Sequence, residues 1–180
     1  WDDVPDMAYN PQESAIFLVT AKNLLETWKW DGSDWTELVT SDVYSDGHPG
    51  IVYDSFREQL ILSHGNQTSI WTGSDWSNAG SNIHSLSHDL AYDPIRKQCV
   101  MVSHAGGGIG TTWLFDGSIW SNTGITLPVA YPRLTWDAGT SRIVATGDSY
   151  DSWNREIIWI FDGTGWIGQS LVYLGGPIGR

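Results

Sequence analysis

The clearest structural information in this chain lies in two segments, AYDP at 91–94 and TTWLFDGSIW at 111–120. The first segment ends an apolar run at Asp–Pro, and Pro cannot extend the hydrogen-bonded ladder of a strand. The second ends an apolar run at Asp–Gly, which is typical of a tight hairpin turn. Around these turns we predict three strands at 89–92, 98–103 and 111–115, and a fourth that begins at Trp120.

Both segments recur four times. The first has copies at 7–10, 51–54, 90–93 and 134–137, and the second at 30–35, 71–76, 115–120 and 161–166. The glycines of the second segment lie 41, 44 and 46 residues apart, and a strand-rich repeat of about 40–50 residues is typical of β-propeller blades. We therefore predict an all-β fold, a single β-propeller domain over 1–180 with four four-stranded antiparallel blades. The predicted blades cover about 1–47, 48–86, 87–130 and 131–174, with a tail at 175–180.

The first strand of each repeat has a small residue beside a large aromatic one. The small residues are Ala8, Val52, Ala91 and Thr135, and the aromatic ones are Tyr9, Tyr53, Tyr92 and Trp136. Because side chains alternate across a strand, we expect the small residues around a central axis and the aromatics between neighbouring sheets. We interpret most tryptophans as packing residues. Trp1 and Trp153 lie outside the repeats and are the candidates for stacking on a sugar.

Aromatic–Asp–Pro, an apolar strand and then Thr–Trp–x–Phe–Asp–Gly–x–x–Trp together resemble bacterial kelch-type β-propeller repeats. The resemblance covers essentially the whole chain and implies four-stranded blades around a central axis. The double glycine of kelch repeats is replaced here by other pairs, at 20–21, 64–65, 104–105 and 147–148. Kelch-type propellers usually have more than four blades, so two arrangements stay open: a closed four-bladed ring, and a portion of a larger propeller.

Composition excludes several classes of partner. The 180 residues contain 21 Asp and Glu against 9 Lys and Arg, for a formal net charge of −12, which argues against nucleic acid and anionic membrane surfaces. No apolar run is long enough to insert into a membrane. Cys99 is the single cysteine, so an intrachain disulfide is excluded. The acidic, Trp-rich and cysteine-poor composition favours an extracellular or cell-surface location.

Catalytic motifs are missing from the sequence, so we do not expect an enzyme. There is no nucleophile elbow, phosphate-binding loop or zinc-binding helix, and GGGIG at 106–110 is interpreted as a flexible hairpin loop. His64 and His104 follow serines at what we take to be equivalent repeat positions, which indicates repeat ancestry rather than a metal site.

One group of charged residues is a candidate site. Asp6, Asp89 and Arg133 occupy matching positions on the innermost strands, with Gly50 at the fourth. We expect the two carboxylates to approach each other near the axis, where they form an ion pair with Arg133, hold Ca²⁺, or act as paired catalytic acids. No other cofactor is expected.

Two further sequence features are candidates for modification and assembly. Asn66 begins the acceptor triplet Asn–Gln–Thr for glycosylation, in the hairpin loop of the second repeat. Gly176, Pro177 and Ile178 resemble the approach to another inner strand and form a candidate assembly tail.

Three functions are compatible with the sequence. The first is a non-catalytic extracellular module for protein–protein contact, with other extracellular proteins or with copies of itself head to tail, as in fibres or a surface layer. The second is a lectin-like glycan-binding propeller. The third is a polysaccharide lyase or hydrolase domain, or a fragment of a larger kelch-like propeller. We favour the first.

Overall fold

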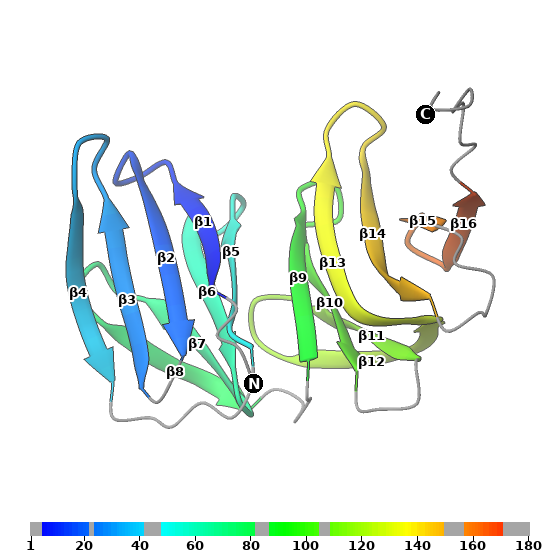
Figure 1. Ribbon diagram of the computed structural model, residues 1–180, viewed down its shortest axis with the longest axis horizontal. Helices are drawn as coiled ribbons and strands as arrows, with labels where there is room; N and C mark the ends of the chain where they lie inside the picture. The colour runs from blue at the N-terminus through cyan, green and yellow to red at the C-terminus, as the bar shows by residue number, and fades with distance from the viewer. Residues whose placement is uncertain are drawn as a thin grey trace, which may run out of the picture.

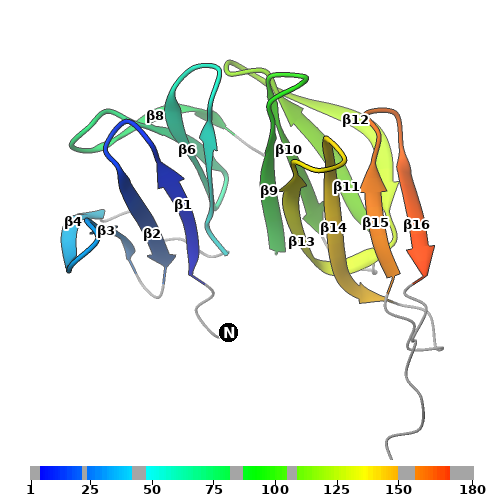
Figure 2. The same cartoon turned by 90° about the horizontal axis from the view of Figure 1, so that it is seen from above.

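The computed structural model describes residues 5–21, 24–41, 48–81, 87–104, 109–149 and 157–170. The described residues form four antiparallel four-stranded sheets arranged as a four-bladed β-propeller (Figures 1 and 2). The predicted fold class is therefore confirmed. No helix in the described part of the chain is long and apolar enough to cross a membrane.

Each blade consists of four consecutive strands, numbered from the inner strand outward. Blade 1 contains β1 (Asp6–Asn10), β2 (Ala15–Ala21), β3 (Leu25–Trp30) and β4 (Trp35–Ser41), and blade 2 contains β5 (Gly50–Asp54), β6 (Gln59–His64), β7 (Gln67–Trp71) and β8 (Trp76–Ser81). Blade 3 contains β9 (Ser87–Asp93), β10 (Gln98–His104), β11 (Gly110–Phe115) and β12 (Trp120–Leu127). Blade 4 contains β13 (Val129–Asp137), β14 (Arg142–Ser149), β15 (Ile157–Phe161) and β16 (Trp166–Ser170). The strands predicted for the third repeat are confirmed, although β9 begins two residues earlier, and β13 begins two residues before the predicted blade boundary.

The acidic residues of both repeated segments form the turns. Oδ1 of Asp93 accepts hydrogen bonds from the backbone N–H groups of Ile95 and Arg96, each at 2.9 Å. In the turn before β12, Oδ1 of Asp116 accepts N–H bonds from Ser118 and Ile119. Asp side chains commonly stabilise turns in this way. The repeated Asp therefore has a structural role in positioning the strands.

The core lies at the junctions between consecutive blades. We call the face of a sheet that is directed toward the preceding blade the leading face. The opposite face, directed toward the following blade, is the trailing face. At the junction of blades 2 and 3, the leading-face residues Tyr92, Cys99 and Phe115 contact Val52 and Ile61 of the trailing face. The same arrangement is found at the other two junctions.

The small residues of the inner strands belong to these junctions. Ala8, Val52 and Ala91 each lie in a cluster with large apolar residues of the following blade. This corrects the expectation that they line the axis. The two faces of an inner strand point at its two neighbouring blades, so a small side chain makes room for the next blade.

Three junctions join the four blades. The inner strands contact each other in the order β1, β5, β9 and β13, and no comparable contact joins β13 to β1 among the described residues. Figure 2 shows blade 1 and blade 4 at the two ends of the arrangement. The sequence left open a closed four-bladed ring and a portion of a larger propeller. A closed ring needs a fourth junction, between blades 4 and 1, and the described residues do not form one.

Candidate functional site

The two carboxylates singled out by the sequence link neighbouring blades. Oδ2 of Asp6 accepts the backbone N–H of Ile51 in blade 2 at 2.8 Å. Oδ2 of Asp89 accepts the N–H of Leu134 in blade 4 at 2.6 Å. The Oδ1 atom of each accepts the N–H of the residue that follows it. Each carboxylate therefore satisfies an inner-strand N–H group of the following blade.

Burial perturbs both carboxylates. Asp89 is 8% exposed, and its burial, together with the negative charge of Asp6, raises its pKa to about 7 against the lowering effects of two N–H bonds and Arg133. Burial also raises the pKa of Asp6. At neutral pH Asp89 is partly protonated.

The geometry of these carboxylates gives little support for the metal and catalytic hypotheses. Ca²⁺ takes about 6–8 oxygen ligands, whereas Asp6 and Asp89 supply four oxygens that already accept N–H groups. Within the described ranges there is no group of three or more His, Cys, Asp or Glu residues that could hold a metal ion. Calcium binding at Asp6 and Asp89 stays an untested prediction.

Gly50 occupies the matching position in blade 2 for a steric reason. A Cβ atom there would lie 2.3 Å from Cδ1 of Leu90 in the following blade. The junction between blades 2 and 3 therefore replaces the Asp-to-backbone hydrogen bond with close contact of the two inner strands.

The histidine positions need a correction. β5 pairs Gly50 with Ser63, whereas β9 pairs Asp89 with Val102. Since Gly50 and Asp89 are equivalent, His64 matches Ser103, and His104 lies one residue further along. A shift of one residue reverses the face of a strand.

The contacts of the histidines agree with this register. Nε2 of His64 lies 3.3 Å from Oγ of Ser69 within blade 2, while the ring of His104 lies 6.0 Å from that of Tyr131 in blade 4. Sequence reasoning missed His88, which is buried between blades 2 and 3 with Nε2 3.3 Å from the carbonyl oxygen of Ser63. Burial lowers its pKa to about 4. The structure thus places these histidines in blade packing.

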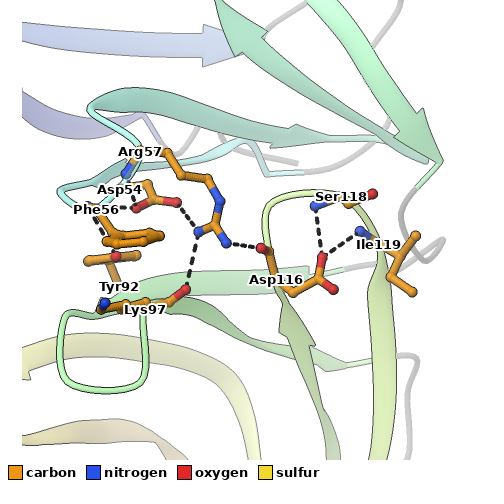
Figure 3. Close-up of polar contacts among 8 residues, drawn as sticks. All are labelled: Asp54, Phe56, Arg57, Tyr92, Lys97, Asp116, Ser118 and Ile119. Atoms are coloured by element: carbon orange, nitrogen blue, oxygen red, sulfur yellow. Dashed lines mark hydrogen bonds and ion pairs between the residues drawn. The ribbon is translucent and has the colours of Figure 1, made fainter.

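Arginine links between blades were also missed (Figure 3). Nη1 of Arg57 donates to Oδ2 of Asp54 at 2.7 Å and to the carbonyl oxygen of Lys97 in blade 3 at 3.1 Å, and Nη2 donates to the carbonyl oxygen of Asp116. Arg96 makes the equivalent bonds to Asp93 and, in blade 4, to the Asp162 carbonyl oxygen. The repeated Asp–x–x–Arg spacing was the available sequence signal.

A second set of links joins the outer parts of the blades. Nε1 of Trp76, Trp120 and Trp166 each donates at 2.8 Å to the threonine hydroxyl of the preceding blade, at Thr27, Thr68 and Thr112 respectively. In blades 2, 3 and 4 the indole N–H of the first tryptophan of the outer strand is therefore satisfied across the junction. Trp35 holds the same position in blade 1.

The leading face of blade 1 is exposed. Met7 and Tyr9 are 58% and 56% exposed, whereas their equivalents in blade 3, Leu90 and Tyr92, are 5% and 7% exposed. Strand register places Tyr9, Ile16, Trp30 and Trp35 in one row across the sheet, and Met7, Leu18 and Trp28 in a second row. We call these seven residues the blade 1 face. Met7, Tyr9 and Trp35 are its exposed members, and the other four residues are partly buried. Exposed apolar residues that gather on a sheet face often mark an interaction site.

Several predicted positions lie elsewhere. Asn66 is exposed in the turn between β6 and β7, and its glycosylation stays a prediction. Trp1, Trp153 and the tail residues Gly176, Pro177 and Ile178 lie outside the described residues.

Comparisons with known proteins show the fold alone. No protein-family model and no curated protein matches the sequence. The structure is similar to the Aleuria aurantia lectin, a fungal fucose-recognising six-bladed β-propeller (12% identity, TM-score 0.65, covering 94% of this chain and 60% of that one). It is also similar to a chain of a nidogen/laminin complex (12%, TM-score 0.60, 87% and 71%) and to TolB from Acinetobacter baumannii (15%, TM-score 0.60, 94% and 43%). The chain thus spans about 60% of the length of the lectin. These likenesses support a β-propeller without singling out kelch repeats.

Proposed function

We propose that this chain is a non-catalytic, extracellular or cell-surface module that contacts other proteins, copies of itself included, through the blade 1 face. The observation that carries the proposal is the exposure of Met7, Tyr9 and Trp35 at positions that are packed in the following blades. An apolar sheet face of this kind is stabilised when a partner covers it.

A surface that can meet the blade 1 face exists at the other end of the chain. Strand register places Thr135, Val144, Ile160 and Ile167 in one row on the trailing face of blade 4. The residues of this row are small or aliphatic, like Val52 and Ile61, which pack against the aromatic leading face of blade 3. Copies that meet in this way form a heterologous, head-to-tail contact.

The proposal is tested by sedimentation velocity at rising protein concentration. We expect the chain to self-associate, and Tyr9→Lys to abolish association because it places a charge in the apolar surface. Ile119→Lys is the matched control, since Ile119 is an equally exposed apolar residue on a turn of blade 3. A chain that stays monomeric at every concentration, or an equal effect of both substitutions, would contradict the proposal.

The likeness to a fucose-recognising lectin favours glycan binding as a second candidate function. Titration with fucose, followed by calorimetry and tryptophan fluorescence, tests it. Saturable binding that survives Tyr9→Lys would place the glycan site away from the blade 1 face, and no binding would remove this candidate.

A further inference from the structure

We propose that the natural complement of the blade 1 face is a further propeller blade, one of two that complete a six-bladed ring with the four described here. This inference rests on the proposed function and names its partner. The additional blades are identified by their chemistry: an aliphatic trailing face, and hydrogen-bond groups at the positions that the internal junctions use.

The first argument is continuity with the internal junctions. Tyr9, Ile16, Trp30 and Trp35 form the same row across blade 1 that Tyr92, Cys99, Phe115 and Trp120 form across blade 3. In blade 3 this row packs on Val52 and Ile61. The blade 1 face thus has the composition and register of a leading face, without a preceding blade to cover it in the described structure.

The second argument comes from the polar links that such a junction requires. At each internal junction the outer-strand tryptophan donates to a threonine of the preceding blade. Trp35 has no such acceptor among the described residues, and its side chain is 38% exposed. A blade with a threonine at the position of Thr112 would supply the acceptor.

Blade 4 is poorly equipped to be that blade. The position of Thr27, Thr68 and Thr112 is Ile158 in blade 4, and the position of Arg57 and Arg96 is Thr140. The position of Asp6 and Asp89 is Arg133, which cannot accept a backbone N–H. The junction of blades 3 and 4 has all three links, and each of the other two internal junctions has two of them. Blade 4, in the same chain or in a second copy, offers its aliphatic row but none of these polar groups.

We take the number of additional blades from the six-bladed propeller to which this structure is similar. The match with the six-bladed propeller covers 94% of this chain and 60% of the length of that propeller. Four blades of six are two thirds of a ring, which is close to this proportion. The arc is open between β13 and β1, as no comparable contact joins them among the described residues, and two blades fill it.

The test adds blades in cis to the full chain. A copy of residues 48–127, which form blades 2 and 3, is placed ahead of Trp1. The trailing face of the added blade 3 then offers Thr112 to Trp35, Arg96 to the turn at Asp31, and Asp89 to the N–H of Met7. Chains extended by one blade (87–127) or by three blades (a third copy of 87–127 added) are the matched controls.

We expect the two-blade extension to unfold in a single transition at a higher urea concentration than the original chain or either control, and to be monomeric. Trp35→Phe should lower the folding equilibrium constant about fivefold in this extended chain, because it removes one junction hydrogen bond, and leave that of the original chain unchanged. Thr112→Val in the added blade should lower the folding equilibrium constant more, about thirtyfold, because it leaves the indole N–H of Trp35 buried without an acceptor.

Three results would overturn the inference. One is an unchanged urea midpoint or a separate transition for the added blades. Another is equal stabilisation by one, two and three blades. The third is a stable dimer of the original chain in which Trp35→Phe weakens association, because the occupant is then a second copy. In that last case the proposed function is retained. If instead the original chain is monomeric and substitutions in the blade 1 face have no effect, the proposed function itself is wrong.

Discussion

The tryptophan–threonine links give a quantitative test of how the blades are held together. Thr68 of blade 2 is 1% exposed, and its hydroxyl accepts the indole N–H of Trp120 in blade 3 at 2.8 Å. Thr68→Val keeps the shape of the side chain and removes the acceptor. Trp120→Phe removes the donor. The double variant has neither group.

The magnitude follows from the asymmetry of hydrogen-bond energetics. A net intramolecular hydrogen bond contributes about 1 kcal/mol, whereas a buried donor left without a partner costs about 1–3 kcal/mol. Thr68→Val should therefore lower the free energy of unfolding by about 2 kcal/mol. For a domain of this size each kcal/mol lowers the melting temperature by roughly 2–4 °C. In the Thr68→Val background, Trp120→Phe should cost about 1 kcal/mol less than in the original chain.

Urea unfolding of the original chain, both single variants and the double variant gives the coupling energy directly. Trp35→Phe is the matched control, since the same substitution in blade 1 removes an N–H without a threonine partner in the described structure. Additive effects of Thr68→Val and Trp120→Phe would show that this hydrogen bond does not stabilise the junction. The same would follow if the cycle of Trp35→Phe with Thr27→Val gave an equal coupling energy.

Three further predictions use other parts of the junctions. Arg57→Met should lower the free energy of unfolding by about 2 kcal/mol, because it leaves the buried Asp54 carboxylate without its cation; the loss is limited because the Arg57 side chain is itself partly exposed. Urea unfolding measures the change, with Arg142→Met at an exposed arginine as the control. Gly50→Ala should cost about 1–3 kcal/mol by overpacking, since its Cβ would lie 2.3 Å from Leu90 Cδ1; Leu90→Val should recover part of the loss, and no cost for the single change would show that Leu90 moves freely. For Asp89, the folded-state pKa of about 7 lies above its ordinary value of 3.8. The contribution of Asp89 to stability is therefore fully present below pH 4 and is lost as pH rises to 7. Asp89→Asn should remove up to about 4 kcal/mol of that pH dependence; identical pH profiles of the two chains between pH 4 and 8 would contradict the raised pKa.

The pH profile of the original chain also contains an opposing contribution. The pKa of His88 is about 4 in the folded state, below its usual 6.5. Protonation of the unfolded chain therefore lowers stability as pH falls from 6.5 to 4. The difference between the original chain and Asp89→Asn isolates the carboxylate, because His88 is present in both.

The sequence by itself determined the repeat and the blade. The Asp residues at 93 and 116 terminate strands by accepting nearby backbone N–H groups, and this is a local effect that a short segment contains. The alternation of residues along β9 also follows from local geometry, because a strand places successive side chains on opposite faces. These local rules were sufficient to predict four four-stranded sheets.

Only the tertiary structure decided which groups meet across the junctions. Arg57 reaches the carbonyl oxygen of Asp116, 59 residues away, and Trp120 reaches Thr68, 52 residues away; neither pairing is contained in the spacing of one repeat. The offset between His64 and His104 likewise depends on strand register, and the exposure of Tyr9 depends on whether a blade precedes it. Each of these properties belongs to a pair of sheets, and the pairing of distant sheets is set by the packing of the whole assembly.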